Sequence, residues 1–239
     1  MSPTPSLTQH LADLDWPTLE RNLDQDGCAA IRNLLLAAQC QRLSGLYADP
    51  GFFRSRVIMA RHGFGRGEYQ YFAYPLPEVI QQLRQSLYPK LVPLANRWNE
   101  CMGLEARFPE QHTDFIQRCH AAGQQRPTPL LLQYGPQDYN CLHQDLYGEH
   151  VFPLQVAILL SEPGEDFTGG EFVLTEQRPR MQSRPQVTDL KQGDAVVFAV
   201  HQRPVKGVRG YYRVNLRHGV SRVHSGRRHT LGIIFHDAQ

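Results

Sequence analysis

The chain has 239 residues, of which 41% are hydrophobic and 20% charged, and its formal net charge is +2. These ordinary proportions exclude an intrinsically disordered, collagen-like or coiled-coil protein, and so small a net charge does not by itself indicate a nucleic-acid-binding protein. Five cysteines without any Cys-x-x-Cys spacing argue against a disulfide framework and a zinc knuckle.

The N-terminal sequence MSPTPSLTQHLADLDW has no basic segment followed by an apolar run. Nowhere does the chain contain the run of about 18 apolar residues that a membrane-spanning helix needs. We therefore expect a cytoplasmic protein that does not associate with a membrane.

Residues 1–126 are mainly helical in pattern, and we expect them to form a helical and strand region that supports a core. Apolar residues at helical spacing predict helices over residues 7–27, where Pro17 suits the start of a second helix. Residues 28–35 predict a short strand, and residues 36–51 predict a helix that ends at an Asp-Pro-Gly turn.

The next two segments contain the turn and helix-breaking residues of this region. Residues 55–75 predict two strands joined by a glycine-rich turn. Residues 77–103 predict one long helix, or a helix pair interrupted at Pro89 and Pro93.

From residue 127 onward the pattern changes to short strands separated by turns or loops. The strands are expected within residues 128–135, 151–164, 169–177, 193–200, 211–223 and 228–236. The connections leave no room for crossover helices, so the strands must form an antiparallel sandwich or barrel. We expect an α+β chain in which residues 127–239 form a mainly β core, packed with the preceding region as one structural unit.

His143 and Asp145 lie in YNCLHQDLYGEH, a segment whose pattern predicts a strand leaving a turn. Side chains two residues apart in a strand point to the same face, so these two could bind one metal ion. An imidazole nitrogen and a carboxylate oxygen suit Fe(II), Mn(II) or Zn(II). In a chain with 11 histidines the pair alone is a weak signal, because chance readily supplies it.

A second histidine from a distant strand would complete a facial triad of two histidines and one carboxylate. His218 is a candidate, and it is followed by Arg228 and Thr230 on one face of the last expected strand. A guanidinium beside a hydroxyl is a good receptor for the remote carboxylate of a dicarboxylic acid.

In this combination the sequence resembles the Fe(II)- and 2-oxoglutarate-dependent oxygenases, whose double-stranded β-helix, a cupin-like jelly roll, carries His-x-Asp, a distal histidine and then an arginine. Its arginine places it near the prolyl-hydroxylase-like branch. More narrowly, RPTPLLLQYGPQDYNCLHQDLYGE, FTGGEFVLTEQRPRMQSR and RHGVSRV resemble a bacterial subfamily described as oxygenases acting on damaged DNA.

The resemblance implies a double-stranded β-helix and a dioxygenase that uses Fe(II), 2-oxoglutarate and O2, with ascorbate as a stimulating reductant. It implies that His143, Asp145 and His218 bind the iron and that Arg228 binds 2-oxoglutarate. It also implies that Tyr134, Gln155 and Thr230 make further contacts with the cosubstrate.

Two features of the sequence leave alternatives open. His201 and Arg209 form a second histidine and arginine pair, but we favour His218 and Arg228 because the strand that begins at Arg228 ends the chain, as the arginine strand of the family ends its core. The sequence also has RHTLGIIFH where the demethylases that repair alkylated bases carry Arg-x-Asn-x-x-x-Arg. In this segment it therefore resembles the prolyl-hydroxylase-like branch and not those demethylases.

The substrate is a separate question. Residues 178–228 are rich in arginine and lysine and would attract a phosphate backbone, although a solvated sheet edge often carries such charges. Tyr69, Tyr71, Phe72 and Tyr74 could form a lid or a stacking surface for a base, or one face of a core strand.

The leading hypothesis is an oxygenase that hydroxylates or oxidatively demethylates modified or damaged DNA or RNA. The alternatives are a hydroxylase of a protein side chain or small molecule, and a non-enzymatic ligand-binding barrel. No protein partner is expected.

Overall fold

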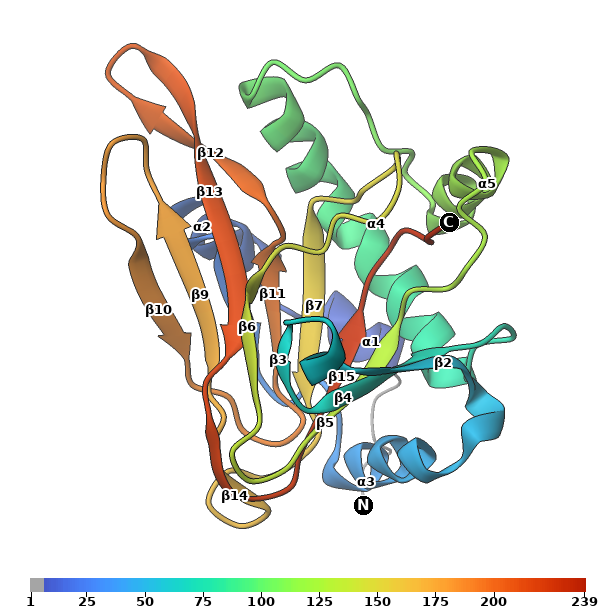
Figure 1. The fold of residues 1–239 in the computed structure, drawn as a ribbon. Coiled ribbons are helices and arrows are strands. Elements are labelled where there is room, and N and C mark those ends of the chain that lie inside the picture. The colour runs from blue at the N-terminus through green and yellow to red at the C-terminus, as the bar shows by residue number, and fades with distance from the viewer. Residues whose placement is uncertain (1–6) are drawn as a thin grey trace.

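The computed structural model describes residues 7–239, so the first six residues of the expected support region lie outside the described part. Two antiparallel sheets face each other, and the helices pack beside the larger sheet (Figure 1). The α-helices are α1 (Leu7–Ala12), α2 (Trp16–Asp26), α3 (Ala37–Gly45), α4 (Glu78–Cys101) and α5 (His112–Ala121). Single 3-10 turns follow at Leu46–Ala48, Pro50–Phe52 and Met59–Arg61.

The larger sheet has seven strands in the order β1-β11-β7-β15-β5-β4-β2. In chain order these strands are β1 (Cys28–Ile31), β2 (Phe53–Ile58), β4 (Glu68–Phe72), β5 (Leu130–Tyr134), β7 (Leu154–Leu159), β11 (Ala195–Ala199) and β15 (Arg228–Ile233). Central strands such as β7 and β11 are buried almost throughout, because the opposite sheet covers one face and helices cover the other.

The facing sheet has the strand order β10-β9-β13-β6-β3, and β12 also pairs with β13. Its strands are β3 (Gly65–Arg66), β6 (Tyr139–His143), β9 (Phe172–Gln177), β10 (Arg184–Thr188), β12 (Gln202–Gly207) and β13 (Gly210–Val220). A separate pair is formed by β8 (Phe167–Gly169) and β14 (Val223–Gly226). The expected α+β class with a double-stranded β-helix is confirmed.

Strands from the first third of the chain extend the larger sheet. β1 pairs with β11 through Cys28 and Phe198, and β4 pairs with β5 through Tyr69 and Leu132. The described residues before residue 127 therefore contribute strands to the larger sheet as well as helices that pack beside it.

The helix α4 runs without interruption through Pro89 and Pro93, which decides between the one-helix and two-helix expectations. Each internal proline costs roughly 3 kcal/mol because it removes a backbone hydrogen bond. That cost is offset by the buried face of the helix, where each fully buried large side chain contributes about 1.5–3 kcal/mol. Its buried apolar members include Ile80, Leu83, Leu87, Leu91, Leu94 and Trp98.

Two buried arginines join the helices α4 and α2 to segments that are distant in the sequence. Arg84 on α4 forms a 2.9 Å ion pair with Asp237, and both side chains are almost fully buried. Arg203 forms an ion pair with Glu176 and donates to the carbonyls of Asp24 and Gln25 at the end of α2. Arg203 thus belongs to the interior and not to the basic surface suggested by the sequence.

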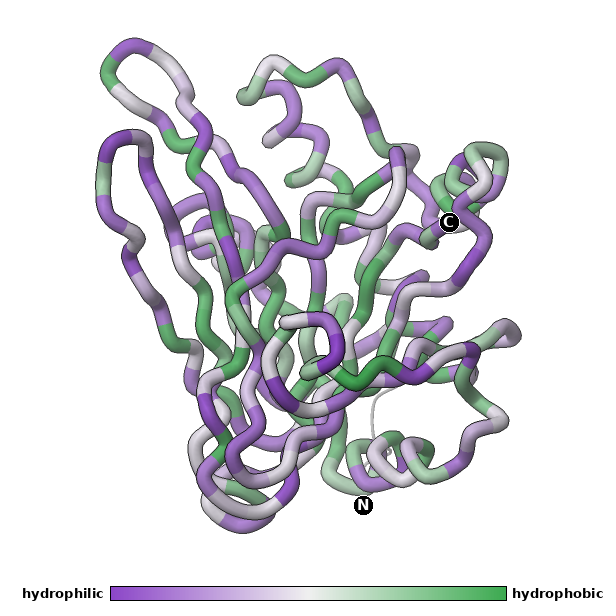
Figure 2. The backbone as a smooth tube through the Cα atoms, viewed as in Figure 1, coloured by the Kyte–Doolittle hydropathy of each residue, from purple (hydrophilic) through white to green (hydrophobic). Residues whose placement is uncertain are grey.

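Figure 2 shows hydrophobic residues gathered along the strands between the two layers, with hydrophilic residues concentrated in the peripheral loops and hairpins. Within residues 7–239, no helix combines the length and the apolar character needed to cross a membrane.

Candidate metal centre and cosubstrate cavity

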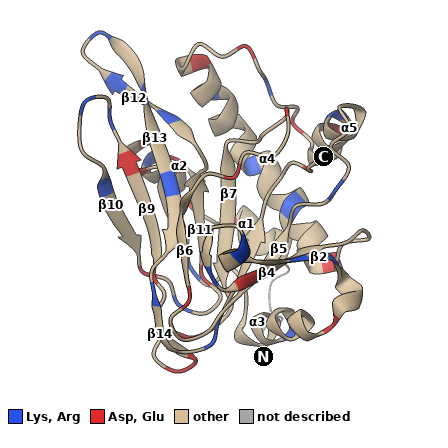
Figure 3. Ribbon diagram, in the orientation of Figure 1, with Lys and Arg blue, Asp and Glu red and all other residues tan. Residues whose placement is uncertain are grey.

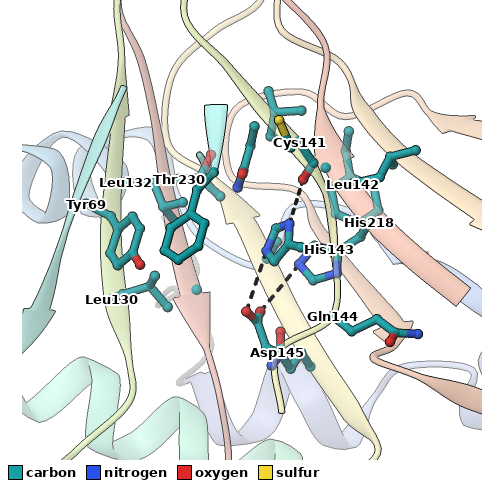
Figure 4. A pocket seen from close by; sticks show the side chains of 18 of the residues that line it. Tyr69, Leu130, Leu132, Cys141, Leu142, His143, Gln144, Asp145, His218 and Thr230 are labelled. Carbon is teal, nitrogen blue, oxygen red and sulfur yellow. Dashed lines mark hydrogen bonds and ion pairs between the residues drawn. The ribbon is translucent and has the colours of Figure 1, made fainter. Parts of the chain in front are cut away.

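The proposed metal ligands come from two neighbouring strands of the smaller sheet. His143 is the last residue of β6, and His218 lies directly opposite it on β13. Asp145 lies two residues beyond the end of β6, not within a strand as the sequence pattern predicted. The chain nevertheless turns its carboxylate back towards both imidazoles (Figure 4).

The three side chains are close enough to bind one ion. Their ligand atoms all lie within 4.8 Å of one another. Asp145 Oδ1 is 3.5 Å from His143 Nε2, and Asp145 Oδ2 is 3.4 Å from His218 Nε2. The imidazole ring centres are 4.2 Å apart. Two imidazoles and one carboxylate are the ligand set that non-haem Fe(II) oxygenases use.

The tautomer of His143 is fixed by its neighbour on the same strand. Its Nδ1 lies 2.8 Å from the carbonyl oxygen of Cys141. A carbonyl only accepts hydrogen bonds, so Nδ1 must be the donor of this bond, and Nε2 is the nitrogen that faces Asp145. This is the usual support of a metal-binding histidine, whose other nitrogen donates to a carbonyl or carboxylate.

The charges within the group suit a cation. Burial raises the pKa of Asp145, but the hydrogen bond with His218 and the two histidine charges outweigh it and hold that pKa well below its usual range. Burial lowers the pKa of His218, which favours the neutral imidazole that binds metals. The Tyr147 hydroxyl donates a 2.8 Å hydrogen bond to Asp145 Oδ1 and so fixes the carboxylate from outside the group.

A cavity of about 390 Å³ opens beside these ligands, between the two sheets. Across it, Tyr69, Leu130, Leu132 and Thr230 face the histidine side (Figure 4). The residues expected from the family resemblance to contact the cosubstrate also line it: Arg228, Tyr134, Thr230 and Gln155.

Arg228 begins β15 and is 2% exposed. It donates to the Thr230 hydroxyl, and its guanidinium carbon lies 5.6 Å from the centre of the Tyr134 ring. No carboxylate of residues 7–239 lies within ion-pair distance of it. Burial lowers the pKa of Arg228 to about 10, so the group remains charged at neutral pH.

Several buried polar atoms of the cavity have no hydrogen-bond partner among residues 7–239. They are Tyr134 Oη, Gln155 Nε2, Arg228 Nε and His218 Nδ1. Buried donors are normally satisfied, and each unsatisfied one costs about 1–3 kcal/mol. This concentration around one cavity fits a polar ligand that would satisfy them.

The alternative pair is placed elsewhere. His201 immediately precedes β12, and Arg209 is exposed at the tip of the β12–β13 hairpin. Neither lines the cavity. The structure therefore brings His218, and not His201, to His143 and Asp145.

The four aromatic residues proposed as a lid do not form one surface. Tyr69 lines the cavity, and Tyr71 packs behind it with the rings at 5.3 Å. Phe72 is fully buried on the other face of the strand, and Tyr74 donates to Asp237 and does not line the cavity. Among these four residues only Tyr69 is placed for a lid or a stacking surface, and that role stays a prediction.

Two residues near the site were not predicted from the sequence. Tyr147 supports Asp145, and Phe64, which is 47% exposed, lines the mouth of the cavity. The only sequence signal for Tyr147 was its position two residues after Asp145. Phe64 lies in the glycine-rich turn, where the sequence pattern indicates only a connection between two strands.

The amino-acid sequence matches one family model over residues 67–238. That family is described as "Oxygenase, catalysing oxidative methylation of damaged DNA". Among curated proteins, two uncharacterized proteins of Mycobacterium tuberculosis, from strains CDC 1551 / Oshkosh and H37Rv, are each 54% identical over 167 residues. The match covers 70% of this chain and 72% of the relative.

Solved structures with similar folds include a Pseudomonas putida prolyl-4-hydroxylase, with a TM-score of 0.54 and 14% identity over 94% of this chain and 99% of that one. A Trichoplax adhaerens prolyl hydroxylase has a TM-score of 0.58 and 14% identity, and the match covers 95% of this chain and 90% of that one. A 2OG-Fe(II) oxygenase family oxidoreductase of Burkholderia pseudomallei has a TM-score of 0.55 and 16% identity, and the match covers 95% of this chain and 93% of that one.

Proposed function

This chain belongs to the family of oxygenases described as catalysing oxidative methylation of damaged DNA, and on that premise we propose that it oxidises alkyl groups of damaged bases with 2-oxoglutarate as cosubstrate. The observation that carries the proposal is the buried guanidinium of Arg228, which has no carboxylate partner within residues 7–239 and lies in the cavity that also holds the His143, Asp145 and His218 group. A buried charge is costly unless it is paired, so the cavity favours an anionic ligand.

The side chains present fit the cofactors of this chemistry. His143, Asp145 and His218 would bind Fe(II), because they offer two imidazoles and one carboxylate whose ligand atoms lie within 4.8 Å of one another. When bound, the iron supplies the activation of O2, and the overall reaction converts 2-oxoglutarate to succinate and CO2 while one oxygen atom enters a substrate C–H bond.

The protein's own residues bind and orient the cosubstrate. Arg228, with Thr230 beside it, would pair with the C5 carboxylate of 2-oxoglutarate. The unsatisfied hydroxyl of Tyr134 and amide of Gln155 would donate to the same molecule. Leu130, Leu132 and Phe198 line the cavity with apolar surface and limit access of water.

An N-methyl group suits the product chemistry that we propose. Hydroxylation of N–CH3 gives N–CH2OH, which breaks its C–N bond, returns a proton to the ring nitrogen and leaves as formaldehyde. The apolar cavity wall and Tyr69 are suited to a planar base that has been extruded from a stack. Ascorbate is expected to stimulate turnover, and a DNA substrate is consistent with action in the cytoplasm.

The test is to incubate the protein with Fe(II), 2-oxoglutarate and N-methylated oligonucleotides, and to follow succinate, formaldehyde and the mass of the oligonucleotide. We expect the loss of one methylene group, coupled to succinate formation. His143→Ala should abolish both signals, whereas His201→Ala, which changes a histidine outside the cavity, should retain them. Oxidation of a peptide or metabolite with no change in any alkylated oligonucleotide would refute the proposed substrate.

A further inference from the structure

A second hollow, of about 260 Å³, lies on the outer face of the smaller sheet and is not part of the catalytic cavity. Its polar lining consists of Gln144, Thr175, Gln177, Ser183, Asn215 and Arg217. All of these side chains can form hydrogen bonds, and most of them are neutral amides or hydroxyls.

The strand register explains why these residues share one face. On β13, His218 and Leu216 are buried, so the alternating residues Asn215 and Arg217 point outwards. On β9, Asn215 lies opposite Gln177, and Arg217 lies opposite Thr175. The alternation that directs His218 to the metal ligands therefore builds the hollow on the reverse side of the same strand.

The charge on this face is positive. Arg217 is exposed, and no side-chain partner for it is found among residues 7–239. None of the residues that line the hollow is acidic. The nearest carboxylate on β9, Glu176, is 5% exposed and is neutralised by Arg203 and Arg178. Lys and Arg also lie on β10 and β12, the strands that pair with β9 and β13, and on β13 itself (Figure 3).

The hollow borders the mouth of the catalytic cavity. Leu142 and Gln144 line both, so only the end of β6 separates them. Leu142 is 45% exposed, and Gln144 is held across β13 by a hydrogen bond to the carbonyl of Leu216. A long substrate that passes over Leu142 would therefore extend from the cavity beside His143 to this hollow.

We propose that this hollow binds the nucleotides that neighbour the target base in the same DNA strand. This inference rests on the proposed function. The guanidinium of Arg217 would contact a phosphate, and the amides of Gln177 and Asn215 would hydrogen-bond to base edges or to further phosphate oxygens. A strand over Leu142 would connect this site to the cavity, so the smaller sheet serves the reaction with both faces.

The experiment uses an unmodified, fluorescently labelled single DNA strand of about 15 nucleotides, which is within the range of site sizes of proteins that bind single strands. Its binding is measured by fluorescence anisotropy at several salt concentrations. Arg217→Gln should weaken binding on the order of tenfold, because it removes a charged hydrogen bond. It should also reduce the slope of log K against log salt by about 0.7, the value for one phosphate contact with a single strand. Gln177→Leu should weaken binding without changing that slope.

Arg42→Gln is the matched control, because Arg42 is exposed on α3 and lines none of the hollows near the smaller sheet. Equal affinity and equal salt slope for Arg217→Gln and Arg42→Gln would overturn the inference, provided that both variants melt at the wild-type temperature. A separate assay of the wild type on a methylated trinucleotide tests the proposed function, because so short a substrate does not need the hollow. Absence of oxidation there counts against the function and leaves the binding result to be judged on its own.

Discussion

At the scale of single residues, the protein pairs its buried charges away from the cavity and leaves one unpaired within it. Arg84 and Arg203 each have a carboxylate partner, whereas Arg228 has none among residues 7–239. A cation that is buried without a partner destabilises the folded chain. Its presence beside unsatisfied donors is therefore best explained by an anionic ligand.

Replacing Arg228 separates ligand binding from folding. Arg228→Met should raise the Kd for 2-oxoglutarate roughly 30-fold or more, the equivalent of about 2 kcal/mol for a buried charge pair. The melting temperature without ligand should stay the same or rise, because an uncompensated charge is removed. Isothermal titration calorimetry in Mn(II) and thermal melting measure the two effects. Arg227→Met, at the exposed neighbouring position, should change neither. A wild-type Kd for Arg228→Met would contradict our assignment.

Tyr147 gives a second prediction at this scale. Because its hydroxyl holds Asp145 by a 2.8 Å hydrogen bond, Tyr147→Phe should weaken metal binding by about 10- to 100-fold, as loss of such supporting contacts does elsewhere. Titration with Mn(II), followed by electron paramagnetic resonance, measures the affinity. Tyr139→Phe is the control, since Tyr139 is also on β6 but lies outside the cavity. Equal affinities for the two variants would show that the hydroxyl has no role in the metal site.

At the scale of elements, the sequence predicted the strands that have strong apolar patterns and missed those that are rich in polar or exposed residues. Central strands such as β7 and β11 are hydrophobic runs, and both were expected. The strands β8, β10, β12 and β14 have exposed or polar residues, so only pairing with a neighbour defines them. The helix α5 was missed as well.

The candidate site was predicted in its residues but not in its geometry. The pair His143 and Asp145 was interpreted as two positions of one strand, yet β6 ends at His143. What brings the group together is the long-range pairing of His143 with His218, which no local pattern contains. Likewise, Arg203 looked like a surface charge until its contact with Glu176 placed it in the interior.

The ion pair between Arg84 on α4 and Asp237 near the chain end makes a prediction about elements. Asp237→Asn should cost about 3–5 kcal/mol in the free energy of unfolding at neutral pH, because it leaves the buried Arg84 uncompensated. Burial raises the pKa of Asp237, but Arg84, His120 and Tyr74 outweigh it and lower that pKa on balance. The stabilisation is thus present above the carboxyl pKa of the unfolded chain, about 3.9, and is lost as the pH falls below it.

Urea unfolding of the wild type and Asp237→Asn at pH 7 and near pH 3 tests this sign. The difference between the two proteins should shrink in acid, because the wild-type carboxylate takes up a proton there. Asp114→Asn, at an exposed position of α5, serves as the control and should differ little from the wild type at either pH. A difference that grows in acid would mean that Asp237 is not a stabilising anion.

At the scale of the whole molecule, the two sheets contribute different parts of the candidate site. The smaller sheet carries His143 and His218, while the larger sheet carries Tyr134, Gln155 and Arg228. The cavity exists only where the sheets face each other, so a metal ion and a cosubstrate bound together would connect the two layers. Ligand binding should therefore stabilise the molecule as a unit.

Thermal unfolding measures this connection and also identifies the distal histidine. Mn(II) and 2-oxoglutarate, each at about 100 times its Kd, should each contribute about 2.7 kcal/mol, and together they should raise the Tm of a chain of this size by roughly 10–20 °C. His218→Ala should abolish most of the shift, because His218 Nε2 lies 3.4 Å from Asp145 Oδ2. His201→Ala should retain it, since His201 lies outside the cavity. The reverse result, with the shift lost only in His201→Ala, would overturn the metal centre described by the structure.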